Sequence, residues 1–138
     1  MLLRSSRSVT SGASRCVLGW GAGSVGSSPT TRYLFPWYSD QMAEVGEVGL
    51  VVPITGTLTN FGVLHNITDG NGNSITYTIR VAGSPTALVV TLPSTSGYGA
   101  NTSVSVPVIA GDLVGVSATK PLGIGKSPRN ISTTVDLV

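Results

Sequence analysis

Apolar and polar residues alternate along most of the chain after residue 46. The clearest case is the segment 73–82 (NSITYTIRVA), in which every second residue is a large apolar one. Successive side chains of a strand point to opposite sides, so this alternation predicts strands with one buried and one exposed face. No segment has the spacing of an amphipathic helix. The pattern therefore predicts an all-β protein.

Turn-forming residues divide the alternating segments into about eight strands. The strongest turn signals are DGNGN at 69–73 and AGD at 110–112, because Asp, Asn and Gly favour tight turns. Eight short antiparallel strands favour a jelly roll, and the Cys…Trp…Cys pattern of immunoglobulin domains is absent. We therefore expect an antiparallel, jelly-roll-like β-sandwich. The expected strands are 32–38, 47–54, 56–67, 73–82, 86–92, 103–109, 112–119 and 131–138.

The first 31 residues differ from the rest. They are rich in Ser, Gly and Thr and show neither a helical nor a strand period. We therefore expect an extended N-terminal arm over 1–31 and a sandwich domain over 32–138. Scattered apolar residues such as Trp20 would let the arm dock onto another subunit.

Charge separates the two ends of the chain. Only 10% of the residues are charged, compared with about 25% in ordinary soluble domains. The first 39 residues hold four arginines and no acid, whereas residues 40–138 hold six acids and four basic residues. Four arginines are too sparse for nucleic-acid binding, so we expect them to pair with carboxylates of a partner protein. A mitochondrial transit peptide is the alternative for such a start.

Half of the eight aromatic residues lie in the segment RYLFPWY at 32–38. Pro36 cannot donate a backbone hydrogen bond and so excludes a central strand position. The segment is therefore expected to form an edge strand or an interface patch, two places where aromatic side chains are favoured.

Few residues suggest chemistry. His65 is the only histidine and Cys16 the only cysteine, so a zinc site is not expected, and His65 should lie on the exposed face of a strand. The DGNGN turn is not followed by the further Gly and the Glu that a calcium loop requires. GWGAG at 19–23 is not followed by the Lys of a phosphate loop. No run of apolar residues is long enough to predict a membrane span. We expect no enzyme, no metal and no cofactor.

The body resembles a β-sandwich family of tailed-phage virion proteins. The segments that carry the resemblance are RYLFPWY, VVPITGTLTNFGVLHN, NSITYTIRVAGSPTALVVTL and NTSVSVPVIAGDLVGVSAT, within residues 32–119. The resemblance implies the trimeric jelly rolls of capsid decoration (cement) proteins, head fibres and tail-fibre tips. A basic arm without a collagen-like or coiled-coil stalk favours a short protein fixed directly to a shell.

The expected function is therefore structural. The chain would form a homotrimer on the capsid exterior of a bacteriophage and bind the major capsid protein through its arm. The alternative is a glycan-binding module that uses Trp37, Tyr38 or Tyr98. The expected contact residues are Arg4, Arg7, Arg15, Trp20, Arg32, Tyr33, Phe35, Trp37 and Tyr38.

Overall fold

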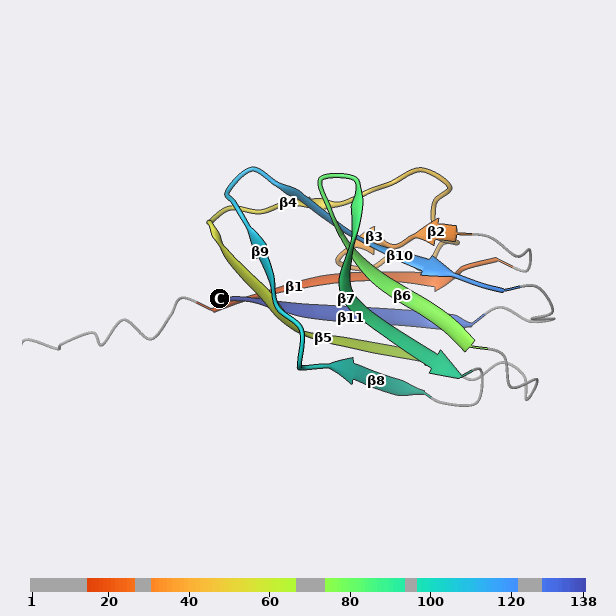
Figure 1. Cartoon of the computed structure of the whole chain (residues 1–138). Helices are drawn as coiled ribbons and strands as arrows, with labels where there is room; N and C mark the ends of the chain where they lie inside the picture. The colour runs from red at the N-terminus through yellow and green to blue at the C-terminus, as the bar shows by residue number, and fades with distance from the viewer. Residues whose placement is uncertain (1–14, 27–30, 67–73, 94–96, 122–127) are drawn as a thin grey trace, which may run out of the picture.

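The computed structural model describes residues 15–26, 31–66, 74–93, 97–121 and 128–138 (Figure 1). These residues form eleven strands and no helix, which confirms the all-β prediction. The strands are β1 (Cys16–Ser24), β2 (Thr31–Tyr33), β3 (Phe35–Pro36), β4 (Leu50–Val51), β5 (Gly56–Asn66), β6 (Ser74–Val81), β7 (Ser84–Pro93), β8 (Tyr98–Asn101), β9 (Val106–Val108), β10 (Leu113–Thr119) and β11 (Arg129–Leu137).

The strands form two antiparallel sheets. The six-stranded sheet has the order β3-β1-β11-β5-β8, and β9 also pairs with β5. The five-stranded sheet has the order β2-β10-β6-β7, and β4 also pairs with β10. The expected antiparallel pairing is therefore confirmed for the strands of both sheets.

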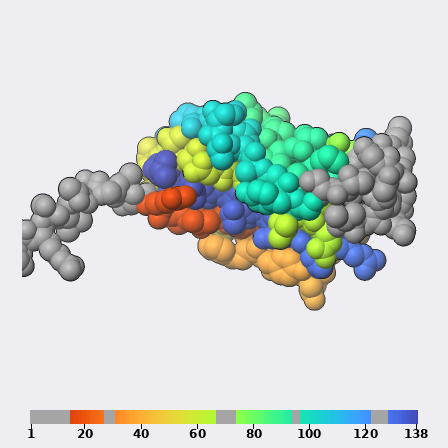
Figure 2. Space-filling model, turned by 90° about the horizontal axis from the view of Figure 1, so that it is seen from below, coloured from red at the N-terminus to blue at the C-terminus, as the bar shows by residue number. Residues whose placement is uncertain are grey.

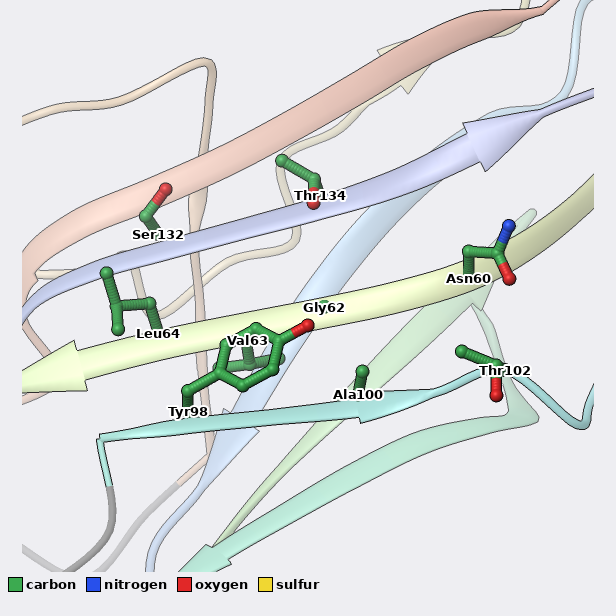
Figure 3. Close-up of a pocket in the computed structure, with 9 residues that line it drawn as sticks. All are labelled: Asn60, Gly62, Val63, Leu64, Tyr98, Ala100, Thr102, Ser132 and Thr134. Atoms are coloured by element: carbon green, nitrogen blue, oxygen red, sulfur yellow. The ribbon is translucent and has the colours of Figure 1, made fainter.

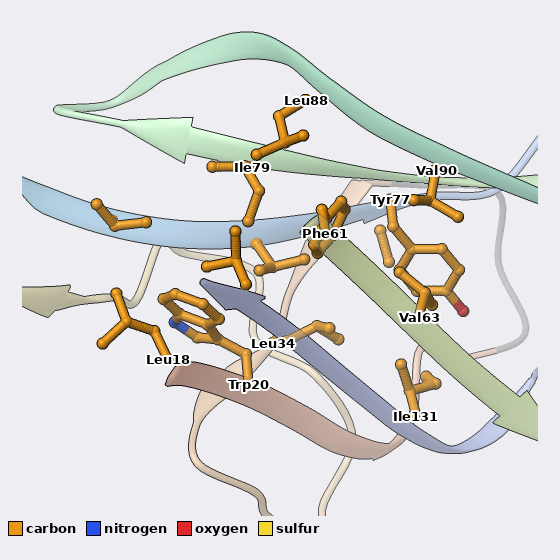
Figure 4. Close-up of a cluster of buried hydrophobic side chains, with 14 of the residues drawn as sticks. Leu18, Trp20, Leu34, Phe61, Val63, Tyr77, Ile79, Leu88, Val90 and Ile131 are labelled. Carbon is orange, nitrogen blue, oxygen red and sulfur yellow. The ribbon is translucent and has the colours of Figure 1, made fainter. Parts of the chain in front are cut away.

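The apolar side chains of both sheets meet in one core (Figure 4). Trp20 and Phe61 contribute from the six-stranded sheet, and Ile79 and Leu88 contribute from the five-stranded sheet; all four are fully buried. Burying each such side chain stabilises the fold by about 1.5–3 kcal/mol. The alternation in the sequence thus places one face of each sheet in this core.

The expected arm requires a correction, because Cys16–Ser24 is a central strand. β1 lies between β3 and β11 and pairs with β11 from Cys16↔Leu137 to Ser24↔Arg129. Its inward side chains, Leu18, Trp20 and Ala22, are buried in the core. The boundary between residues 31 and 32 therefore cuts through the domain. Residues 1–14, which include Arg4 and Arg7, lie outside the described residues.

Glycine concealed this strand in the sequence. The segment 37–41 crosses the outer face of β1, where a Cβ atom on Gly21 would lie 2.6 Å from Tyr38 Cδ2. A Cβ atom on Gly23 would lie 1.9 Å from the carbonyl oxygen of Asp40. Glycine is thus needed at alternate positions for close packing rather than for flexibility. The same glycines masked the period of two.

The number of strands also differs from the expected eight. The segment 32–38 divides into β2 and β3, which belong to different sheets. Buried Leu34 lies between them and donates its backbone N–H to the Val116 oxygen at 3.0 Å. β8 was expected to be a loop, and 47–54 forms only the short strand β4.

His65 lies in the core, contrary to the expected exposed position. Its side chain is 2% exposed, and its Nδ1 atom lies 2.9 Å from the Tyr77 hydroxyl. Burial raises the pKa of Tyr77, so its hydroxyl stays protonated. β5 has a register irregularity around Asn60, whose φ is 54°. An extra residue of this kind moves the following side chains to the other face, and places Phe61, Val63 and His65 inside.

Candidate interaction surface

The outer face of the six-stranded sheet carries a shallow, half-open pocket of about 210 Å³, here called the hollow (Figure 3). It spans β11, β5 and β8. Its lining is uncharged and consists mainly of small side chains. The lining residues are Asn60, Gly62, Val63, Leu64, Tyr98, Ala100, Thr102, Ser132 and Thr134.

Two large side chains stand out in the hollow. Tyr98 is 65% exposed and Leu64 is 51% exposed, and they lie directly opposite each other on β8 and β5. The Tyr98 ring leans over Gly62, where a Cβ atom would lie 3.9 Å from Cε2 and from the hydroxyl oxygen (Figure 3). Tyrosine is enriched at protein interfaces, so the exposed Tyr98 ring beside Leu64 marks this surface as a candidate interface.

Charge is confined to the ends of this surface. Asp136 is almost buried at one end, where it pairs with Arg15 and accepts a hydrogen bond from Asn60 Nδ2 at 2.8 Å. The hydrogen bond from Asn60, aided by Arg15, lowers the pKa of Asp136, although burial opposes the shift. Exposed Arg129 lies at the other end of β11. The middle of the surface is therefore neutral.

Beside the hollow, residues 37–41 form a ridge on the outer face of β1. In Figure 2 the orange segment that contains the ridge lies along one edge of this face and teal β8 along the other, with red β1 and blue β11 between them. Trp37 is 66% exposed and Tyr38 is 51% exposed. The sheet thus presents a ridge and a hollow on the same side.

Trp37 has an unfavourable backbone conformation. Its φ is 69°, a left-handed conformation that costs a residue other than glycine about 1–2 kcal/mol. Its backbone N–H donates to the Gly19 oxygen at 2.7 Å, and the chain then turns back over β1. The Gly23 N–H donates to the Gln41 oxygen at 2.8 Å and fixes the far end of the ridge. The fold therefore holds an exposed tryptophan at a turn that suits Gly or Asn better.

Four of the expected contact residues are held within the domain. Trp20 is fully buried, and Phe35 packs against the core. Tyr33 is half-buried beneath Arg80, whose guanidinium carbon lies 5.6 Å from the ring centroid. Arg15 pairs with Asp136, although the Arg15 side chain itself remains exposed.

Arg32 is half-buried in β2, next to β10. Trp37 and Tyr38 are the expected aromatic contact residues that the structure leaves well exposed, and they lie together on the ridge. Tyr98, which the sequence suggested only as a glycan-binding residue, lies in β8. The other residues that line the hollow could not be predicted from the sequence, because they come from β5, β8 and β11, which are distant in sequence.

Metal-binding clusters and membrane-spanning helices are both absent from the part of the chain that the structure describes. Within the described residues, no three His, Cys, Asp or Glu side chains are grouped as metal ligands. The same part of the chain contains no helix that could cross a membrane.

No protein-family model matches the chain. A search of curated proteins finds no significant match.

Proposed function

We propose that this chain is a structural protein that associates with copies of itself through the outer face of its six-stranded sheet. The observation that carries the proposal is the hollow, an uncharged surface with the exposed side chains of Tyr98 and Leu64 at one end. In the full proposal, a homotrimer sits on the exterior of a phage capsid as a decoration protein. It stabilises the shell by binding neighbouring capsid subunits, and it is not an enzyme.

Strand pairing supports a jelly-roll architecture for this protein. β1 pairs with β11, β2 with β10, β5 with β8, and β6 with β7. These nested pairs fall alternately in the two sheets. This is the pattern of a long antiparallel ribbon that is rolled up on itself, as in the jelly rolls of viral capsid and lectin domains.

The resemblance over residues 32–119 supports the location on a virion. The attachment segment is shorter than the sequence indicated, because β1 belongs to the domain. Residues 1–14 hold Arg4 and Arg7 and no acid, so they suit carboxylates on a shell. In a trimer, three such weak contacts become effectively intramolecular once one has formed, which raises the overall affinity.

Two measurements test this proposal. The mass of the purified protein should be that of a trimer, and a monomer at all accessible concentrations would rule out self-association. A chain that lacks residues 1–14 should remain trimeric but should no longer bind shells assembled from the major capsid protein of the same virus. Full occupancy by this truncated chain would exclude attachment through the N-terminal segment.

A second candidate function is glycan binding at the hollow. The exposed Tyr98 ring lines the same hollow as the hydroxyl groups of Ser132 and Thr134 and the amide of Asn60 (Figure 3). A sugar could stack on such a ring and form hydrogen bonds with these groups. A glycan array would test this function: binding that is lost in Tyr98→Ala would support it, and an array without hits would exclude it.

A further inference from the structure

We propose that the ridge of one copy sits in the hollow of the next copy, so that the contact is head-to-tail and closes into a ring. This inference rests on the self-association proposed above and assigns the two surfaces that make it. The ridge and the hollow are different surfaces on one side of the same sheet. Contacts between two different surfaces generate rings when the rotation closes.

Strand register places the two surfaces at matching heights along the sheet. Tyr38 on the ridge covers Gly21, which is paired with Ser132 of the hollow. Ser132 is paired in turn with Leu64, and Leu64 with Tyr98. The exposed aromatic ring of the ridge therefore lies level with the two large exposed side chains of the hollow.

The tryptophan end of the ridge follows the same rule. Trp37 is bonded to Gly19, which is paired with Thr134 of the hollow. Thr134 is paired with Gly62, and Gly62 with Ala100. The backbone of Trp37 thus lies level with the smallest side chains of the hollow. A rotation about an axis parallel to the strands leaves each residue at the same position along that axis. It therefore brings each part of the ridge opposite the part of the hollow at the same level in the next copy.

Charge at the ends of both surfaces agrees with this arrangement. Exposed Asp40 lies at one end of the ridge, over Gly23. Exposed Arg129 lies near this end of β11, paired with Ser24, the residue after Gly23. The rotation that seats the ridge therefore brings Asp40 of one copy towards the end of β11 that carries Arg129. At the opposite end the Asp136 carboxylate is already neutralised by Arg15.

The backbone of Trp37 is consistent with this role. A left-handed tryptophan that is 66% exposed contributes little burial within its own subunit. Residues kept in rare conformations mark sites where the strain serves a function, and tryptophan is the residue type most enriched among interface residues with large binding effects. Seating in the hollow of a neighbour gives Trp37 the burial that its own subunit does not.

Cysteine cross-linking tests the head-to-tail contact in the intact assembly. Tyr38→Cys and Ser132→Cys are made separately in a Cys16→Ser chain, and the two proteins are mixed and oxidised. The expected product is a disulfide-linked dimer of unlike chains, several-fold more abundant than dimers of like chains. Thr91→Cys, exposed on the other sheet, is the matched control for Ser132→Cys and should give no such product. Equal cross-linking by all pairs, or none from the mixture, would overturn the proposal.

Two charged variants give an independent readout. Trp37→Asp and Leu64→Asp should each weaken association at least tenfold, as measured by analytical ultracentrifugation, while circular dichroism and melting temperature show folded subunits. Asp is among the residues that tolerate positive φ, and Trp37→Asn serves as a second ridge variant without added charge. If the wild type is oligomeric and all three variants associate normally, the surfaces are wrong and self-association stands. If the wild type is monomeric, both proposals fail.

Discussion

The two sheets of this protein have outer faces of different character. On the five-stranded sheet, Arg80 donates to Glu47 Oε1 at 3.0 Å and lies over the Tyr33 ring. The backbone of Val48 crosses the same face, where a Cβ atom on Gly115 would lie 2.7 Å from the Val48 oxygen. The six-stranded sheet is covered in the same manner by the ridge, but only over β1. Its other strands, β11, β5 and β8, leave the hollow open.

The difference shows in how each region uses glycine. Gly115 and Gly23 lie beneath crossing segments and leave no room for a Cβ atom. Gly62 lies in the hollow, where a Cβ atom would meet Thr134 Oγ1 at 3.5 Å, an ordinary contact distance. Packing within the subunit therefore explains the first two glycines and does not require the third. No crossing segment closes the hollow beside Gly62 and the Tyr98 ring, so a partner can enter there, which is what the ridge-in-hollow contact needs.

The largest expected effect is on the covered part of the six-stranded sheet. Gly23→Ala should lower the free energy of unfolding by about 3 kcal/mol, because the new methyl group meets the Asp40 carbonyl and forces the ridge off β1. Urea denaturation measures this loss. Gly19→Ala is the matched control, since its Cβ atom would have a 3.4 Å contact to the Thr133 oxygen. Equal losses in the two variants would show that β1 does not need the ridge.

The next effect concerns the closed face of the five-stranded sheet. Glu47→Gln should cost about 1–2 kcal/mol, since the partly buried Arg80 loses a charge-assisted hydrogen bond. Association should be unchanged, because this face has no role in the proposed ring. Glu44→Gln, exposed on the same connection, is the control and should have little effect on stability. A change in the oligomeric mass of Glu47→Gln would show that both outer faces take part in assembly.

A smaller loss in the free energy of unfolding, about 1 kcal/mol, is expected for Asp136→Asn at the end of the hollow. Its pKa is lowered in the folded chain by Asn60 and Arg15, whereas an unfolded Asp titrates near about 3.9. A lowered carboxyl pKa stabilises the fold above the unfolded value, and this contribution is lost as pH falls through the folded value. As pH is lowered from 6, the free energy of unfolding should therefore fall less steeply in Asp136→Asn than in the wild type. Asp40→Asn is the control, and an unchanged pH profile in Asp136→Asn would contradict the assignment.

The smallest effect on the subunit is expected at Gly62. Gly62→Ala should change the free energy of unfolding by no more than about 0.5 kcal/mol, because the hollow has room for the methyl group. The same substitution should weaken self-association, since Trp37 of the next copy would occupy that space. Thermal denaturation and analytical ultracentrifugation separate the two outcomes. Normal association of Gly62→Ala would mean that the partner does not enter the hollow at this level.

Local pattern predicted the central hairpin well. The expected strands 73–82 and 86–92 correspond to β6 and β7, since the first alternates clearly, the second is a short apolar run, and a tight turn joins them. Prediction failed where alternation was masked or shifted. Glycines hid β1, and the irregularity at Asn60 reversed the expected exposure of His65.

The sequence by itself determined that the protein is all-β, because a period of two depends only on neighbouring residues. It also predicted Trp37 and Tyr38 as contact residues because aromatic side chains are favoured at interfaces, and the structure leaves both side chains exposed. Only the tertiary structure decided that Cys16–Ser24 is a central strand, because its partner β11 lies more than 100 residues away. It also decided where the hollow lies and that Arg15 is paired. The physical reason is that antiparallel pairing joins distant segments, and local periodicity carries no information about which segments meet.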